Sequence, residues 1–283
     1  MKLERIAEPM VRLALTEDFG SGDITTEAIV PADATATGTI VARAEGILAG
    51  LAVGRLAFAA ADPSVVHKAL LKDGAALRPG EAICKVSGPA RGILAAERVA
   101  LNFMQRLSGV ATATRRFVEA VKGTGVTILD TRKTTPGLRV LEKYAVSVGG
   151  GGNHRFGLFD MYLIKDNHLK IAPGIGEAVA MVRGSESGLP VEVEVTTLEE
   201  LAEACAAGVD RVMLDNMSLD EVRRACEIVK NIPEGRGRPK VEVSGGVTLK
   251  GVRDLALCGV DYISVGAITH SATAVDMSLE LEA

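Results

Sequence analysis

Cationic residues follow one short apolar run near the middle of the 283-residue chain. The run Val126–Asp130 has the pattern of a short buried strand, and Arg132 and Lys133 come directly after it. A four-glycine loop further along leads to His154 and Arg155. Guanidinium and ammonium groups bind carboxylates and phosphates through charge-assisted hydrogen bonds. This stretch therefore predicts a site for a small ligand that carries several negative charges.

Charged residues also mark the later apolar runs. Lys165 ends one run, Asp215 and Asn216 end another, and the run Val191–Val195 carries Glu192 and Glu194 on one side. Asp215 with Asn216 has a second interpretation, as the cap of a following helix. A buried carboxylate without a partner is costly, so Glu192 or Glu194 is harder to explain structurally. Charges at several strand ends together predict one shared site.

The last two apolar runs end in small residues. These turns are Ser244, Gly245 and Gly246, and then Val265, Gly266 and Ala267. Barrels often bind phosphate at their final strands, through bare backbone N–H groups and a helix N-terminus. The sequence thus predicts a site that binds phosphate on one side and a carboxylate-like anion on the other. The acids lie between these two sides, where positive charge develops or a metal ion binds.

Strands and helices alternate from residue 126 onward, which predicts parallel strands joined by right-handed crossovers. Helices are expected near 138–147, 174–183, 197–207, 218–230 and 248–258. Six strands are expected, at Val126–Leu129, Met161–Ile164, Val191–Val195, Arg211–Leu214, Val241–Val243 and Tyr262–Val265. The spacing fits a (β/α) barrel, and because only six strands are clear, the barrel is expected to be incomplete or to carry irregular strands. A doubly wound open sheet is the competing fold. In a barrel the charged positions lie at the carboxyl ends of the strands, where chemistry is found.

The first part of the chain predicts a small α/β sandwich. Residues 3–19 have the apolar stripe of a helix, and a turn with Asp23 or Thr25 follows. Short strands and tight turns are expected between 34 and 92, with one helix near 50–60. A helix over 94–108 carries Arg98 and Arg106 on one side, positions that usually hold solvated residues. A break at Gly109 and a second helix ending near Gly123 are expected next.

Composition excludes several classes of function. The chain has 32 basic and 36 acidic residues, a net charge of −4, and no Trp, which argues against nucleic-acid binding. No run of 18 or more apolar residues appears, so no membrane span is expected. The four cysteines lack the spacing of a metal site and are interpreted as reduced thiols of a cytoplasmic protein.

The chain resembles the quinolinate phosphoribosyltransferase family, also called carboxylating nicotinate-nucleotide pyrophosphorylases, nearly from end to end. The motifs that carry the resemblance are Glu17–Thr26, Glu97–Phe103, Leu107–Gly109, Asp130–Gly137, Gly151–Arg155, Leu163–His168, Glu192–Val195, Leu214–Met217, Ser244–Gly246 and Val265–His270. The resemblance implies an α/β fold with an N-terminal α/β sandwich domain (1–109), an incomplete seven-stranded (β/α) barrel (110–270) and a C-terminal segment (271–283) packing on the first domain. It implies a homodimer in which one subunit's sandwich covers the other's barrel mouth.

The family joins quinolinate to phosphoribosyl pyrophosphate with Mg²⁺, and releases CO2, pyrophosphate and nicotinate mononucleotide. By resemblance, quinolinate is bound by Arg132, His154, Arg155 and Lys165, with Arg98 from the partner subunit. Lys133 lies on the pyrophosphate or ribose side, and Glu194 and Asp215 face the ribose hydroxyls and the magnesium. Ser244, Gly245, Gly246, Val265, Gly266 and Ala267 hold the 5′-phosphate.

Two other functions fit part of the pattern. A phosphoribosyltransferase of the same fold that acts on another ring, such as the molybdenum-transport-associated homologues, would not need so many cations. A non-catalytic sensor of a phosphate ligand would be hindered by Glu194 and Asp215, because acids beside a phosphate site weaken anion binding unless a metal or a cation intervenes.

Overall fold

The computed structural model describes residues 3–185, 187–233 and 237–282. The chain forms two compact units that are interleaved along the sequence. The first unit combines the chain up to Arg115 with Thr134–Gly150 and the segment from Ala267 onward. The second unit consists of Arg116–Lys133 and Gly151–Gly266. The sequence predicted two consecutive domains that meet near residue 109. In the structure, residues 134–150 belong to the same unit as the first part of the chain.

The first unit is built on a four-stranded antiparallel sheet with the order β12-β1-β5-β3. Its strands are β1 (Thr35–Ala42), β3 (Val66–Ala69), β5 (Ala82–Pro89) and β12 (Met277–Leu281). A two-stranded ribbon joins β2 (Gly46–Ile47) to β4 (Ala76–Leu77). The strands of residues 34–92 were expected, and β12 places the C-terminal segment at the edge of this sheet, beside β1.

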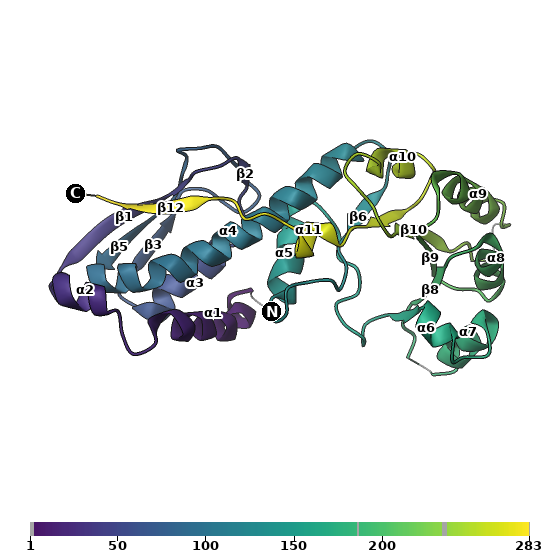
Figure 1. The fold of residues 1–283 in the computed structure, drawn as a ribbon, viewed down its shortest axis with the longest axis horizontal. Coiled ribbons are helices and arrows are strands. Elements are labelled where there is room, and N and C mark those ends of the chain that lie inside the picture. The colour runs from purple at the N-terminus through teal and green to yellow at the C-terminus, as the bar shows by residue number, and fades with distance from the viewer. Residues whose placement is uncertain (1–2, 186, 234–236, 283) are drawn as a thin grey trace. The chain divides into compact units, whose positions relative to one another are not determined.

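Helices cover one face of the antiparallel sheet (Figure 1). They are α1 (Leu3–Phe19), which packs on α3 (Leu51–Ala61), and the first part of α4 (Ala90–Ala120). The short helix α2 (Ile24–Ile29) follows α1, and the Asp23 side chain accepts a hydrogen bond from the Thr26 N–H to cap it. Two more helices of this unit, α5 (Arg139–Gly149) and α11 (Ala267–His270), lie against each other.

The expected break at Gly109 is wrong, because α4 runs without interruption through Gly109. Glycine serves another purpose there. A Cβ atom added to Gly109 would lie 2.2 Å from the carbonyl oxygen of Thr273. The helix therefore needs a residue without a side chain where the C-terminal segment crosses it, and its regular hydrogen bonds continue.

The second unit is built on a parallel sheet of six described strands in the order β6-β11-β10-β9-β8-β7. The strands are β6 (Thr127–Leu129), β7 (Tyr162–Ile164), β8 (Val191–Val195), β9 (Arg211–Asp215), β10 (Lys240–Ser244) and β11 (Tyr262–Ser264). All six coincide with the strands expected from the alternating pattern. Valines and leucines such as Val193 and Leu214 are fully buried, as parallel strands covered on both faces require.

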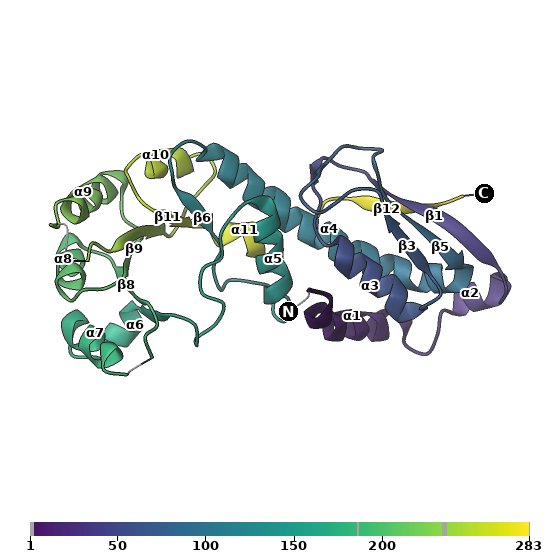
Figure 2. The same cartoon turned by 180° about the vertical axis from the view of Figure 1, so that it is seen from behind.

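Helices line the outside of this parallel sheet (Figure 2). They are α6 (Asp166–Leu169), α7 (Ile175–Arg183), α8 (Leu198–Ala206), α9 (Leu219–Lys230) and α10 (Val252–Ala256). Capping boxes at Thr197 and Ser218 begin α8 and α9. Ser218, not Asp215 or Asn216, is therefore the cap of α9.

The parallel sheet does not close into a barrel within the described residues. Gly152 adds a single parallel bridge beside Leu129 of β6, and no described strand joins that segment to β7 at the opposite edge. This arrangement agrees with the expected incomplete barrel, with the bridge at Gly152 in the place of a seventh strand. Within the described residues, no helix is both long and apolar enough to cross a membrane.

Candidate active site

A cavity of about 550 Å³ lies at the carboxyl edge of the parallel sheet, within the second unit. Its walls come from the ends of all six strands. The lining residues are Thr131, Arg132, Lys133, His154, Arg155, Leu163, Lys165, Glu194, Met213, Asp215, Asn216, Ser244, Gly245, Gly246 and Ser264. Parallel strands end at the same edge, so residues distant in sequence meet there. Most of the predicted site residues thus share one cavity.

Four cations line this cavity, and we call three of them, Arg132, Arg155 and Lys165, the cationic wall. Burial, and then repulsion by the positive charge of Arg132, lower the pKa of Arg155. Arg155 Nη1 donates to the Met161 carbonyl at 3.3 Å, while its buried Nε has no hydrogen-bond partner among the described residues. Such a wall favours an anionic ligand.

Lys165 is held by an acid of the same cavity. Its Nζ pairs with Glu194 Oε2. The Glu194 side chain is only 10% exposed and the Lys165 side chain 41%, so the lysine keeps a face toward the cavity while the carboxylate is largely enclosed. The Lys165 backbone N–H donates to His168 Nδ1 at 2.9 Å, which fixes the start of α6. The pair leaves the cavity polar without leaving a buried charge unmatched.

His154 is buried at the back of the cavity. Its backbone N–H donates to Asp130 Oδ1 at 2.8 Å, so the end of β6 fixes the loop that follows the four glycines. Its ring Nδ1 accepts a hydrogen bond from the Arg155 backbone N–H at 2.7 Å. Asp130 itself is fully buried. The histidine ring and the Arg155 backbone are therefore positioned together.

Asp215 and the glycine turn after β10 face the cavity from neighbouring strands. Asn216 Nδ2 donates to Asp215 Oδ2 at 2.8 Å, and the Asn216 N–H donates to the Ser244 carbonyl. Asn216 adopts a positive φ of 53°, which is uncommon for a residue other than glycine. A Cβ atom on Gly245 would lie 2.3 Å from Asn216 Oδ1. Glycine is thus required where the turn passes Asn216.

Some predicted residues lie outside this cavity. Arg98 belongs to the first unit, where its side chain is 57% exposed and lies 4.0 Å from the Glu97 carboxylate. Val265 is buried behind the last turn, Gly266 ends the second unit, and Ala267 begins α11 in the first unit. The second glycine-containing turn therefore does not line the cavity with Ser244, Gly245 and Gly246.

Two family models match nearly the whole chain. The N-terminal domain of quinolinate phosphoribosyl transferase matches residues 23–108, and the C-terminal domain of the same family matches residues 110–280. The chain belongs to this family. It is 45% identical over 270 residues to the probable nicotinate-nucleotide pyrophosphorylase (carboxylating) of Bacillus subtilis, an alignment that covers 94% of this chain and 90% of that protein.

Other members of the quinolinate phosphoribosyltransferase family agree in sequence and in fold. The mitochondrial quinolinate phosphoribosyltransferase (decarboxylating) 2b of Nicotiana tabacum is 41% identical, with 96% of this chain and 81% of that protein covered. The solved nicotinate-nucleotide pyrophosphorylase of Francisella tularensis is 40% identical, with a TM-score of 0.91 over 100% of this chain and 98% of that one. The fold is therefore that of the family.

Sequence reasoning named Glu192 but missed Glu242, and these two acids form a second layer of charge outside the cavity of this family member. Glu192 and Glu242 are fully buried on β8 and β10, and burial raises the pKa of each carboxyl to about 7. Arg211 Nη1 lies 2.8 Å from Glu242 Oε2, with its guanidinium over the Tyr262 ring. The Val-Glu-Val pattern of β8 recurs in β10 and would have indicated Glu242. Glu192 and Glu194 share one face, as expected, but only Glu194 lines the cavity.

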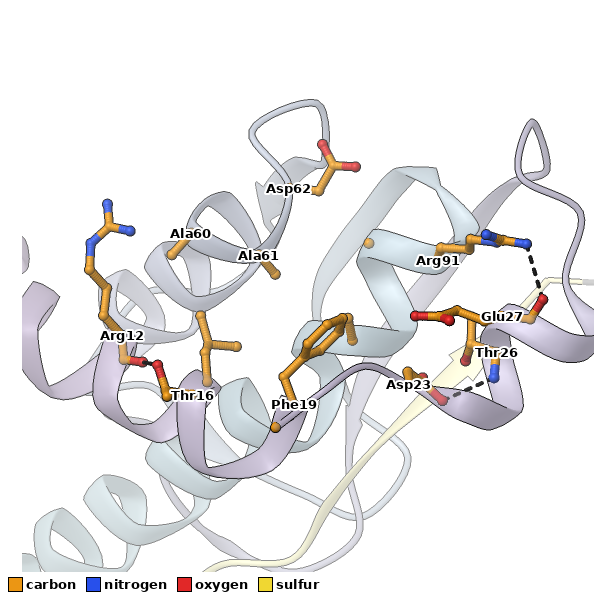
Figure 3. A pocket seen from close by; sticks show the side chains of 14 residues that line it. Arg12, Thr16, Phe19, Asp23, Thr26, Glu27, Ala60, Ala61, Asp62 and Arg91 are labelled. Atoms are coloured by element: carbon orange, nitrogen blue, oxygen red, sulfur yellow. Dashed lines mark hydrogen bonds between the residues drawn. The ribbon is translucent and has the colours of Figure 1, made fainter.

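A larger cavity, of about 650 Å³, lies in the first unit between α1, α2, α3 and α4. Phe19 projects into it, and its charges are of both signs (Figure 3). Arg91 already donates to the carbonyls of Glu27 and Val30, and Arg12 pairs with Glu8. This cavity thus lacks the convergent cations that mark the site in the second unit.

Proposed function

We infer that this chain transfers the phosphoribosyl group of phosphoribosyl pyrophosphate to quinolinate, and releases pyrophosphate, CO2 and nicotinate mononucleotide. The observation that carries this inference is the cavity of the second unit. The cationic wall, a bare glycine turn and two carboxylates on neighbouring strands line this one cavity, in a chain of the quinolinate phosphoribosyltransferase family. The reaction is a step of NAD biosynthesis.

Quinolinate carries two carboxylates, and the cationic wall supplies matching charges. Arg132, Arg155 and Lys165 are proposed to bind them, with the His154 ring packed against the same ligand. The buried Arg155 Nε supports this role, because a buried donor without a partner is costly until an acceptor meets it. A monocarboxylate such as nicotinate would leave one cation unmatched, which gives the wall its selectivity for a dicarboxylate.

The phosphoribosyl donor is proposed to bind on the opposite side. The backbone N–H groups of Ser244, Gly245 and Gly246 suit its 5′-phosphate, because no side chain at Gly246 obstructs them. Val265, Gly266 and Ala267 are proposed to complete that binding site. Lys133 lines the cavity and is proposed to stabilise the charge of the leaving pyrophosphate.

Glu194 and Asp215 are proposed as the acids of the reaction. Loss of pyrophosphate builds positive charge at the anomeric carbon, and carboxylates nearby stabilise that charge electrostatically. Carboxylates together with donor phosphates also form the usual environment of Mg²⁺, so the residues present fit this ion. The ion, held by Glu194 and Asp215 through the donor or through water, would offset the charge of the leaving pyrophosphate.

The pyridine nitrogen of quinolinate is itself the nucleophile, so the protein contributes chiefly orientation. Attack at the anomeric carbon forms the new C–N bond while the bond to pyrophosphate breaks. The ring nitrogen is then cationic. It stabilises the electron pair left on the ring carbon when the adjacent carboxylate departs as CO2, and a proton from solvent completes that carbon.

Assembly and location extend this proposal. We propose a homodimer in which Arg98 of one subunit completes the cationic wall of the other, and the exposed guanidinium of Arg98 is consistent with that role. We also propose a cytoplasmic location, as the absence of a membrane-spanning helix among the described residues allows, although relatives in plants bear mitochondrial and chloroplastic names.

The test is product identification with three rings. Purified protein, phosphoribosyl pyrophosphate and Mg²⁺ are supplied with quinolinate, nicotinate or a neutral pyridine, and the nucleotides formed are separated by chromatography. Of the three rings, we expect only quinolinate to be converted, and its product to be nicotinate mononucleotide. Turnover of nicotinate or of a neutral ring in place of quinolinate would support the rival ring specificity, and binding of the donor without turnover of any ring would support a sensor.

A further inference from the structure

A buried polar cluster lies beneath the cavity of the second unit. It contains His154, Glu192 and Glu242, whose ligand-type atoms all lie within 4.8 Å of one another. His154 Nε2 is 3.1 Å from Glu192 Oε2 and 3.4 Å from Glu242 Oε1, and neither oxygen is in line with the ring N–H. Both carboxyl groups are fully buried, on strands β8 and β10 that flank β9. The roles proposed above do not use this carboxyl pair.

The ring of His154 identifies what the cluster does. Its Nδ1 accepts the Arg155 backbone N–H, so Nδ1 carries no proton. In the neutral ring the proton is then on Nε2, where it faces the two carboxyl groups. A metal ion bound at Nε2 would leave the ring proton on Nδ1, at the place where the Arg155 amide hydrogen already points. The geometry therefore favours a cluster in which the ring proton faces the two carboxyl groups over a metal site.

The cluster is connected to the cationic wall in two ways. The first is the hydrogen bond from the Arg155 N–H to His154, which couples the ring to the Arg155 backbone. The second is charge, because Glu192 favours the charged form of the Arg155 guanidinium, against the opposing effects of burial and of Arg132. On the far side, Arg211 pairs with Glu242 and keeps that carboxyl in place.

We propose that Glu192 and Glu242 are positioning residues for quinolinate: their carboxyl groups attract the Nε2–H of His154 electrostatically, and through its ring they orient the backbone and guanidinium of Arg155. This proposal rests on the function proposed above. It explains why two acids are buried directly beneath a site for anions, where an unneeded negative charge would oppose binding. It also assigns different roles to the two acids of β8: Glu194 lines the cavity, and Glu192 supports the cationic wall.

Glu192 variants test the proposal through ligand affinity. Glu192→Leu removes the carboxyl group that faces His154 at similar volume, and Glu192→Gln retains a polar oxygen toward the His154 Nε2–H. By calorimetry, we expect Glu192→Leu to weaken quinolinate binding about tenfold or more with donor affinity unchanged within about twofold, and Glu192→Gln to recover most of the loss. Where Glu192→Leu fails to fold, Glu242→Leu provides the second reading, with the same expected loss of quinolinate affinity and unchanged donor affinity.

Val193→Ala is the matched control, because Val193 is fully buried on the same strand and faces away from Glu192. We expect it to lower stability without changing the ratio of the two affinities. Equal losses for quinolinate and donor in Glu192→Leu, or the same ratio as in Val193→Ala, would overturn the positioning role. Wild-type protein that binds no quinolinate at all would instead contradict the proposed function.

The tautomer of His154 gives a measurement independent of ligand binding. In ¹⁵N-labelled protein we expect an unprotonated Nδ1 and a protonated Nε2 for His154 in the wild type, and a changed ring signal in Glu192→Leu. Dialysed wild-type protein loaded with Zn²⁺ should retain no ion at this cluster. A proton on Nδ1, or one equivalent of Zn²⁺ lost on Glu192→Gln, would overturn the proposal.

Discussion

Gly245→Ala should impair binding of the phosphoribosyl donor far more than Gly246→Ala does. Both glycines have a positive φ, 92° at Gly245 and 56° at Gly246, so alanine meets backbone strain of about 1–2 kcal/mol at either position. At Gly245 the new Cβ would also lie 2.3 Å from Asn216 Oδ1 and 2.9 Å from the Asn216 nitrogen, whereas nothing lies within 4 Å at Gly246. Only the first substitution must displace Asn216.

The extra cost at Gly245 is that of overpacking, about 1–3 kcal/mol, which corresponds to a factor of about 5 to about 150 if it falls on donor affinity. Displacing Asn216 also disturbs its hydrogen bond to Asp215. The assay is the steady-state KM for phosphoribosyl pyrophosphate and for quinolinate in both variants, with thermal unfolding as the control for folding. Equal donor KM values in the two variants would refute the reasoning, as would a loss at Gly245 confined to quinolinate.

Three further predictions concern the cationic wall, the magnesium and the long helix. Arg132→Ala should raise the quinolinate KM about ten- to a hundred-fold with little change for the donor, since one charge-assisted interaction is lost; equal losses would mean that Arg132 does not bind the ring. Removal of Mg²⁺ with a chelator should stop nucleotide formation while quinolinate binding by calorimetry persists, and turnover that survives chelation would count against the proposed magnesium. Gly109→Ala should lower stability in urea by about 1–3 kcal/mol, because its Cβ would meet the Thr273 carbonyl. Gly176→Ala on α7, where an added Cβ would meet only the Glu203 side chain at 3.9 Å, should be neutral or slightly stabilising, and the same loss in both variants would disprove the close-contact explanation.

The sequence was sufficient to predict that charged residues gather at the strand ends, for two reasons. Short apolar runs that alternate with helices predict parallel strands, and parallel strands bring their carboxyl ends to one edge. Arg132, Lys165 and Asp215 could therefore be grouped before any coordinates were known. The same alternation placed Glu192 and Glu194 on one face of β8.

The depth of each side chain was not predictable in this way. The alternation of apolar and polar residues shows which face of a strand a side chain occupies, but not how far that side chain lies from the end of the strand. It therefore did not show that Glu194 lines the cavity whereas Glu192 does not. The contact of Arg211 with Glu242 depends on the register between β9 and β10, which local sequence does not determine. Likewise, Gly109 was expected to end a helix, because the crossing segment at Thr273 is far away in the chain.

The most direct test of the central claim is release of labelled CO2 from quinolinate that carries ¹⁴C in the carboxyl group next to the ring nitrogen. With phosphoribosyl pyrophosphate and Mg²⁺, we expect one CO2 for each nicotinate mononucleotide formed, and none when the donor is omitted, because the ring nitrogen must first become cationic. CO2 released without the donor, or a nucleotide that retains the label, would contradict the account.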